Sequence, residues 1–417
     1  MRSTRSTLAI LGAVCTLLLT ACTAAMPVSA PTPSPNGALP GFADNVDEIS
    51  PLVLTTLTPD PIPFAGTDGK VHLAYEIQVL NAGPRPATLT KLQTLSNGPK
   101  GKVIAEIDAP ELAVQTTLVG DLSVGNVIPP GRTALVVLDT RFDAKKDVPA
   151  ALIHRISATF ATSPSDDRLA KLYPTEATQF GGSVITSTDS VLTIGPPLTG
   201  NNWVTIGSCC ELAGHRGFIL PMGGRLNATE RFGLDMIQID THRERLVDEA
   251  TGALASFTGD PKVATNYFAF GEPVLSVADG TVIGVKNTFV DHPVEGFSEG
   301  LQMADLTGNY VIIDVGNGIS AMVNHLVQGS VTVKVGDKVA RGQRIGKVGN
   351  SGNSTQPHLH FQMFRGSAPL MGENVPFQFN NFTLVGGMHD GLYVTDGAGP
   401  QSKKYPLVNS ITDYPKH

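Results

Sequence analysis

The sequence predicts an all-β protein built from two successive β domains. Only 16% of its 417 residues are charged, while 44 glycines and 30 prolines supply many turn positions. This balance favours short strands and turns over long, salt-bridged helices. Apolar residues in the first half recur in short alternating runs that no long helical pattern interrupts. The chain also exceeds the length of one typical core, so we expect two or three domains.

The chain begins with the features of a secretory signal. Two arginines precede an apolar run, Leu8–Leu19, that is too short to span a bilayer as a mature helix. The run ends in Leu19-Thr20-Ala21-Cys22, which resembles the bacterial lipobox. That resemblance implies that residues 1–21 are a lipoprotein signal peptide and that Cys22 is acylated. The protein would then be extracytoplasmic and anchored to a membrane of the cell envelope. The alternative is an ordinary signal peptide that is cut a few residues later.

Two segments with different predicted structures follow the signal peptide. Residues 22–50 are rich in proline and poor in bulky apolar side chains, which predicts an extended tether. Residues 51–195 predict an antiparallel sandwich similar to immunoglobulin-like adhesion domains. Apolar residues alternate with polar or small ones from Val71 to Val79, before a turn signal at 81–84. The further expected strands are Thr88–Leu95, Thr133–Leu138 and Leu152–Phe160.

The first domain shows no motif that indicates chemistry. Its histidines, His72 and His154, lie within predicted strands and have no metal-like neighbour in sequence. We therefore expect both to be surface or core histidines. The predicted role of this domain is to act as a spacer or to bind a partner.

Residues 196–390 contain the candidate catalytic motif. His358 and His360 are two residues apart, so in a strand both would project to one side. Glycine-rich turns and strand-like runs precede them, among them Val335–Gly349, and Asn324-His325-Leu326 lies upstream. This order and spacing resemble those of the lysostaphin/LytM-type zinc metallopeptidases, which cut peptide bonds of bacterial cell-wall peptidoglycan. The resemblance extends from about Arg231 to Met363 and implies a small antiparallel β barrel or sandwich.

The resemblance also implies the roles of individual residues. Asp235 and His360 match two zinc ligands of the family, and His325 and His358 match its catalytic pair. Three protein ligands leave zinc one open position for a water molecule, whose pKa falls towards neutrality. One imidazole can then accept the proton of that water, while the other donates to the oxyanion of the tetrahedral intermediate.

The first zinc ligand of the family is missing from this sequence. Arg231 stands where the family has the histidine of His-x-x-x-Asp, and a guanidinium has no lone pair to offer a metal. We expect Arg231 and Asp235 to share a strand face. His215 is the best replacement ligand, because a hairpin between residues 215–220 and 229–239 would bring it close to Asp235.

Other interpretations of this site remain open in the sequence. Cys209 or Cys210 could approach Asp235 as ligands, or the adjacent cysteines could form a disulfide or a buried pair. His242 is a weaker candidate ligand. If no residue replaces the missing histidine, the domain would be a degenerate relative. It would then bind cell wall or a protein partner as a scaffold or regulator without cutting.

The remaining features indicate other properties of the chain. The formal charge of −7, without a Lys/Arg cluster, gives no reason to expect nucleic-acid binding. The segment Val335–Gly349 also resembles biotinyl and lipoyl carrier domains, but Lys286 lacks the context of a modified lysine. Residues 391–417 predict a C-terminal tail. The aromatic side chains that precede it, Phe377, Phe379 and Phe382, are expected to pack in the core.

Overall fold

The computed structural model describes residues 50–58, 60–120, 123–161, 172–212, 214–294 and 301–416. The predicted signal peptide at 1–21, the lipidation site Cys22 and residues 23–49 of the predicted tether lie outside the described residues. Strands dominate the described part, in which α1 (Ala109–Gln115) is the only α-helix, so the all-β prediction is confirmed. Among the residues with assigned structure, no helix is long and apolar enough to cross a bilayer.

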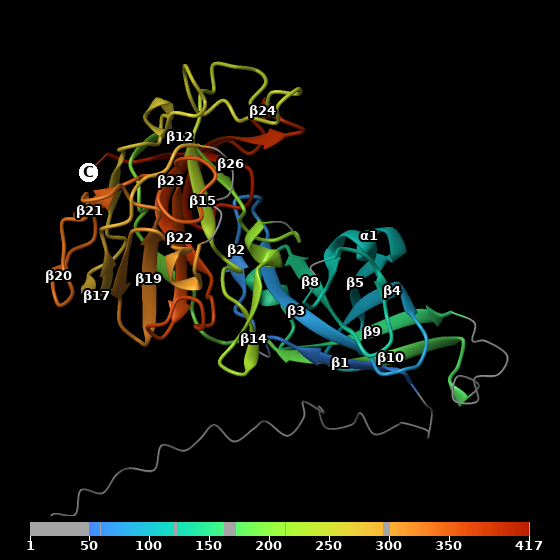
Figure 1. Cartoon of the computed structure of the whole chain (residues 1–417). Coiled ribbons are helices and arrows are strands. Elements are labelled where there is room, and N and C mark those ends of the chain that lie inside the picture. The colour runs from blue at the N-terminus through green and yellow to red at the C-terminus, as the bar shows by residue number, and fades with distance from the viewer. Residues whose placement is uncertain are drawn as a thin grey trace, which may run out of the picture. The chain divides into compact units, whose positions relative to one another are not determined.

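Two antiparallel sheets form the first part of the described chain (Figure 1). One has the order β1-β3-β8-β6 with β2 beside β3, and the other has the order β10-β9-β4-β5 with β7 beside β4. Buried side chains from both sheets, such as Tyr75 and Leu92, share one core, so the two sheets form a sandwich. Its likeness to immunoglobulin-like domains stays a prediction. The strands are β1 (Leu52–Thr56), β2 (Phe64–Ala65), β3 (Val71–Asn81), β4 (Ala87–Ser96), β5 (Val103–Asp108), β6 (Thr116–Leu118), β7 (Val127–Ile128), β8 (Thr133–Phe142), β9 (Ala151–Phe160) and β10 (Glu176–Ile185).

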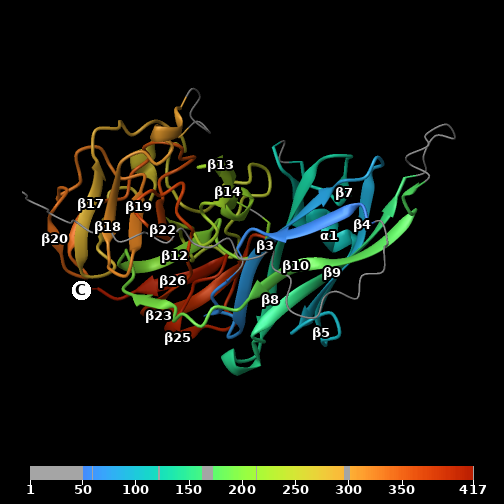
Figure 2. The same cartoon turned by 90° about the horizontal axis from the view of Figure 1, so that it is seen from below.

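A twelve-stranded sheet dominates the second part of the chain. Its order is β11-β23-β26-β12-β15-β22-β19-β18-β17-β20, with β24 and β25 beside β23. Figure 2 shows β17, β18, β19 and β22 side by side. Strands β13 and β14 pair with each other, as do β16 and β21. The strands are β11 (Leu192–Ile194), β12 (Gly200–Ile206), β13 (Ile219–Met222), β14 (Arg225–Ala228), β15 (Leu234–Gln238), β16 (Pro273–Leu275), β17 (Gly280–Lys286), β18 (Tyr310–Asp314), β19 (Ile319–Asn324), β20 (Lys338–Val339), β21 (Arg344–Lys347), β22 (Leu359–Arg365), β23 (Phe377–His389), β24 (Leu392–Val394), β25 (Gly399–Lys404) and β26 (Ser410–Tyr414).

The last strands of the chain belong to this sheet and to its core. β26 pairs with both β12 and β23. The predicted packing of Phe377, Phe379 and Phe382 is confirmed, because all three are buried in one cluster. Phe64 of β2 is buried in the same cluster, and the Ala65 carbonyl accepts a hydrogen bond from the backbone N–H of Tyr405 at 2.8 Å. The sandwich strand β2 is therefore built into the second core.

The predicted hairpin between residues 215–220 and 229–239 is wrong. β13 pairs with β14 instead, across a tight turn in which Gly223 and Gly224 have φ values of 61° and 77°. Consecutive residues with positive φ suit the two-residue hairpin turns that match strand twist. Asp235 on β15 consequently lies opposite Ile206 of β12. His215 lies in a short 3₁₀ helix, η3 (Gly214–Gly217).

A buried carboxylate connects the sandwich to the second part of the chain. Glu76 on β3 accepts hydrogen bonds from Arg231 Nη2 at 2.6 Å and from Arg216 Nη2 at 3.1 Å. Arg216 Nη2 also lies 3.1 Å from the Tyr75 carbonyl and 3.3 Å from the Leu138 carbonyl. Burial alone would raise the pKa of Glu76, but Arg231 and Arg216 outweigh burial and hold that pKa below its usual value. Glu76 is therefore an anion shared by two cations from the second part of the chain.

Replacing Glu76 with glutamine should strongly destabilise the protein. The substitution preserves side-chain size but leaves two buried guanidinium groups without an anion, and breaking a buried ion pair in this way costs about 3–5 kcal/mol. Urea unfolding of the two proteins would measure the difference. Glu106→Gln is the matched control in the same sandwich, since Glu106 pairs with Lys91 at the surface, where ion pairs contribute little. Equal effects of the two substitutions would contradict the proposed importance of the Glu76 pair.

Candidate metal centre

Three neighbouring strands bring the predicted site residues together. Asp235 on β15 is paired with His360 on β22, although the two are 125 residues apart in sequence. On its other side, His360 is paired with Asn324, the last residue of β19. His325 directly follows Asn324, and His358 directly precedes β22. The sheet register therefore places all four residues at the same end of the three neighbouring strands β15, β22 and β19.

The carboxylate of Asp235 lies at the centre of the group. His215 Nε2 is 3.2 Å from Asp235 Oδ2, and His360 Nδ1 is 3.0 Å from Oδ1. His358 Nε2 is 3.3 Å from the same Oδ1. The ring centroids of His215 and His360 are 4.7 Å apart, and those of His325 and His358 are 4.8 Å apart. The structure thus gathers all five of the predicted ligands and catalytic histidines.

Two glycines make room for His215. A Cβ atom on Gly233 would lie 2.9 Å from His215 Nδ1 and 3.1 Å from His360 Cε1. A Cβ atom on Gly207 would lie 3.0 Å from His215 Cε1, and Gly207 has a φ of +65°, a conformation that favours glycine. A side chain at either position would therefore crowd the His215 imidazole.

In His325, His358 and His360, a hydrogen bond from one ring nitrogen to a residue outside the group determines which nitrogen faces the site. His360 Nε2 donates to Gln362 Oε1 at 2.9 Å, which leaves Nδ1 facing Asp235. His358 Nδ1 donates to the Gln356 carbonyl at 2.7 Å, and His325 Nδ1 donates to the Ser351 carbonyl at 2.8 Å. Since carbonyl oxygens only accept, Nε2 of both of these histidines is left for chemistry. Such outer partners commonly orient metal-binding imidazoles.

The electrostatics of the group are dominated by Asp235. Burial by itself would raise the pKa of Asp235, but His215 and His358 outweigh burial and hold this pKa well below its usual value. For the basic side chain of His215, burial has the opposite effect and would lower the pKa. The Asp235 carboxylate outweighs it and raises the pKa of His215 to about 10. Burial, together with His358 and His360, lowers the pKa of His325. Asp235 is therefore an anion surrounded by imidazoles, as a cation site requires.

Arg231 does not lie beside Asp235 on a strand. It precedes β15, in a turn, so the prediction that residues 231 and 235 share a strand face is wrong. The physical reason is the Glu76 carboxylate, which both Arg231 Nε and Nη2 contact at 3.0 Å or less. The guanidinium is held in this buried ion pair, and the residue that lies beside Asp235 Oδ2 is His215, at 3.2 Å.

The donor set fits one zinc ion. Ligand atoms of His215, Asp235 and His360 all lie within 4.8 Å of one another. Atoms bound to one tetrahedral zinc at about 2 Å lie roughly 3.3 Å apart, close to the 3.2 Å and 3.0 Å separations observed from Asp235 to its two imidazole neighbours. Two imidazoles and one carboxylate are also a common set for catalytic zinc.

Several residues of the site were not identified from the sequence. Gln362 lies two residues after His360 and shares its strand face, a spacing that could have revealed it. Glu76 gave no such signal, because it lies in the sandwich, 155 residues before Arg231. Cys209 and Cys210 are joined by a disulfide, and the described group around Asp235 includes neither.

Comparison with known proteins identifies part of the chain. Residues 263–371 match the model of peptidase family M23. The peptidoglycan DD-endopeptidase ShyA of Vibrio cholerae is 38% identical over 108 residues, which cover 25% of this chain and 21% of ShyA. ShyB of the same organism is 34% identical over 100 residues, which cover 24% of this chain and 19% of ShyB. The chain thus spans about a fifth of the length of these curated relatives.

Solved structures of the same family were also found. The catalytic domain of the prophage-encoded M23 protein EnpA from Enterococcus faecalis is 26% identical, covers 29% of this chain and 84% of its own, and gives a TM-score of 0.20. The matched segment 263–371 contains His325, His358 and His360, whereas Asp235 and His215 precede it. Residues 263–371 are therefore similar to a peptidase family M23 domain, and they contain three of the five candidate site residues.

Proposed function

We propose that this protein is a zinc metalloendopeptidase that cuts peptide bonds of cell-wall peptidoglycan. The observation that carries the proposal is the position of two imidazoles, His215 and His360, at opposite oxygens of Asp235. This geometry would provide three ligands although Arg231 stands in the sequence where the family has its first histidine. The substrate class is proposed from ShyA and ShyB, which are peptidoglycan DD-endopeptidases.

The residues around the metal site have distinct tasks in this proposal. A zinc ion held by His215, Asp235 and His360 would act as a Lewis acid and bring the pKa of a water molecule towards neutrality. His325 and His358 each have Nδ1–H committed to a backbone carbonyl. Their Nε2 atoms can therefore divide the remaining work. One, as a neutral imidazole, would accept the proton of the attacking water. The other would need a second proton, on Nε2, and as an imidazolium would donate to the oxyanion that forms on the peptide carbonyl.

We also propose that the protein acts outside the cytoplasm, held to a membrane by acylated Cys22. The lipobox-like sequence at 19–22 supports this location, and cell-wall peptide bonds lie in the same compartment. The proline-rich residues 22–50 would then separate the sandwich from the bilayer.

Zinc binding should depend on His215. The purified mature protein is expected to contain about one zinc per chain. His215→Ala and Asp235→Ala should lose it, because each removes one of three ligands. Gln362→Leu retains the ligands but removes the acceptor that orients His360, and should weaken zinc binding about 10–100-fold. Elemental analysis and competition with a chromogenic chelator would measure both effects.

Two further variants make the zinc measurement decisive. His242→Ala is the control, since His242 is an exposed histidine and its removal should leave the zinc content unchanged. Arg231→His restores the residue type that the family has at this position and removes the contact of Arg231 with Glu76. Zinc absent from the wild type and present in Arg231→His would refute His215 as the replacement ligand.

Hydrolysis should depend on the two other histidines. His325→Gln and His358→Gln are expected to retain zinc but to release peptides from purified peptidoglycan about 10²–10⁴ times more slowly, the usual contribution of a general acid or base. Chromatography of the soluble peptides would measure this release. A wild type that binds zinc but releases no peptides would instead favour the non-catalytic, wall-binding alternative.

Membrane attachment should require Cys22. Cys22→Ser is expected to move the protein from the membrane fraction to the soluble extracytoplasmic fraction, because it removes the thiol that would carry lipid. Mass spectrometry of the mature N-terminus is the direct measurement. An unmodified N-terminus generated beyond residue 22 would refute the anchor and would support an ordinary signal peptide.

A further inference from the structure

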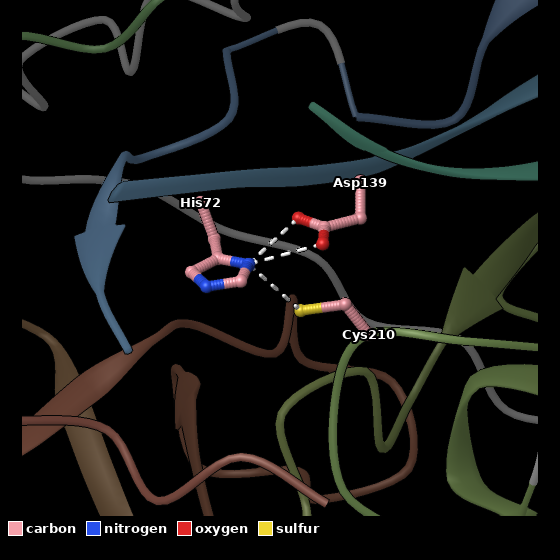
Figure 3. Close-up of side chains that lie close together, drawn as sticks. All are labelled: His72, Asp139 and Cys210. Carbon is pink, nitrogen blue, oxygen red and sulfur yellow. Dashed lines mark hydrogen bonds and ion pairs between the residues drawn. The ribbon is translucent and has the colours of Figure 1, made fainter. Parts of the chain in front are cut away.

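A second group of possible metal ligands lies away from Asp235. It consists of His72 on β3, Asp139 on β8 and Cys210 after β12, and one ligand atom of each lies within 4.8 Å of the others. Figure 3 shows the three side chains pointing toward one another from these separate segments. His72 and Cys210 are buried. The group contains none of the residues assigned to the peptidase centre.

One nitrogen of His72 is the meeting point of the group. His72 Nδ1 lies 3.0 Å from Asp139 Oδ2, 3.1 Å from Oδ1 and 3.9 Å from Cys210 Sγ. Zinc bonds are about 2.0–2.1 Å to nitrogen or oxygen and about 2.3 Å to thiolate sulfur, so a nitrogen and a sulfur on one tetrahedral zinc lie roughly 3.6 Å apart. The observed separations are close to those of a shared ion.

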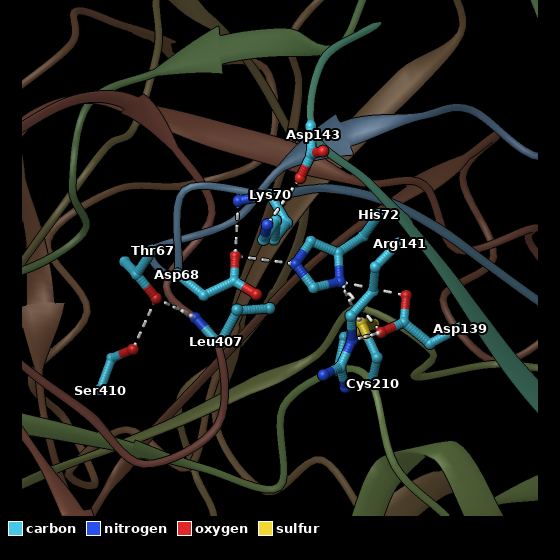
Figure 4. A network of polar contacts seen from close by, with 11 residues as sticks. Thr67, Asp68, Lys70, His72, Asp139, Arg141, Asp143, Cys210, Leu407 and Ser410 are labelled. Atoms are coloured by element: carbon cyan, nitrogen blue, oxygen red, sulfur yellow. Dashed lines mark hydrogen bonds and ion pairs between the residues drawn. A yellow bond between two sulfur atoms is a disulfide. The ribbon is translucent and has the colours of Figure 1, made fainter. Parts of the chain in front are cut away.

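The other nitrogen of His72 is held by a second carboxylate. His72 Nε2 donates to Asp68 Oδ1 at 3.0 Å (Figure 4). A carboxylate that orients the ring from behind is a recurrent feature of metal-binding histidines. Burial would lower the pKa of His72, but Asp139 and Asp68 raise it to about 9. Nδ1 thus faces Asp139 and Nε2 faces Asp68, so both ring nitrogens of His72 lie against carboxylates.

The third donor is blocked while Cys210 is oxidised. Cys209 and Cys210 form a disulfide, whose sulfurs carry no thiolate charge. A dithiol could reduce it, since a thiolate of the reductant attacks one sulfur and the second thiol completes the exchange. The S–S bond breaks, two electrons pass to the cysteines, and the dithiol leaves as a disulfide. Cys209 Sγ faces Arg216 Nη1 at 3.8 Å, so only Cys210 faces His72.

We propose that reduction of the Cys209–Cys210 disulfide creates a second zinc site, formed by His72, Asp139 and the Cys210 thiolate. Binding releases the Cys210 thiol proton and the His72 Nδ1 proton, so that thiolate, imidazole and carboxylate face the cation. Thiolate and imidazole together favour zinc over magnesium or calcium. The partly exposed side chains of Asp68 and Arg141 border the group and contact His72 and Asp139, respectively. This proposal does not depend on the proposed peptidase function.

Two matched cysteine variants test the site without a reductant. Cys209→Ser and Cys210→Ser each abolish the disulfide and leave one free thiol. The free thiol faces His72 only in Cys209→Ser. The mature protein would be stripped with a chelator and titrated with cobalt(II), whose thiolate complexes absorb in the near ultraviolet. We expect Cys209→Ser to bind about one more metal than the oxidised wild type and to show the thiolate band. Cys210→Ser should do neither.

The reduced wild type provides an independent measurement. After dithiol treatment and desalting without air, it should gain about one metal per chain and the same absorption band. Asp139→Asn should reduce its affinity for this additional metal at least tenfold. If reduced wild type gains no metal, or if the two serine variants bind equally, the proposal is wrong. Loss of metal from the Asp235 site alone would lower the number of metal ions bound per chain, but it would not change the thiolate absorption band.

Discussion

The buried ion pairs of Glu76 with Arg216 and Arg231 are the interactions on which the rest of the structure depends. Glu76 is buried in the sandwich strand β3 and holds two arginines that come from the second part of the chain. Buried charges are tolerated only when they are paired and hydrogen-bonded, so Glu76 and the two arginines depend on one another in the folded protein. Arg231 is thereby kept away from Asp235. Arg216 is fixed directly beside His215, the residue proposed to take the vacant ligand position.

Much of the fold and most of the site were predictable because their signals are local. Alternating apolar residues from Val71 to Val79 indicate a strand with a buried face, and the structure has β3 there. The spacing of His358 and His360, with Asp235 and His325 upstream, resembles a family in which these residues converge. His215 was reached through a hairpin that does not exist. It nevertheless lies beside Asp235, because the short η3 helix returns the chain to β15.

The remaining features depend on contacts between distant segments. Nothing near Arg231 in sequence shows that its partner is Glu76, 155 residues earlier. His72 was expected to be an ordinary surface or core histidine, because Asp139 and Cys210 reach it from other segments. The tail after residue 390 supplies strands β24, β25 and β26 to the large sheet, although its composition is that of a polar extension. Such pairings are set by tertiary packing, which single-sequence patterns do not encode.

The shared ion pair determines how far the M23-like part can be separated from the sandwich. Many enzyme domains can be excised or attached to new partners because few contacts cross their boundaries. Here a cut near residue 196 would remove the anionic partner of Arg216 and Arg231 and uncover the surface next to His215. Transfer to another protein would have to include β3, whose Glu76 balances those charges. The two parts therefore form one unit of design, not two interchangeable modules.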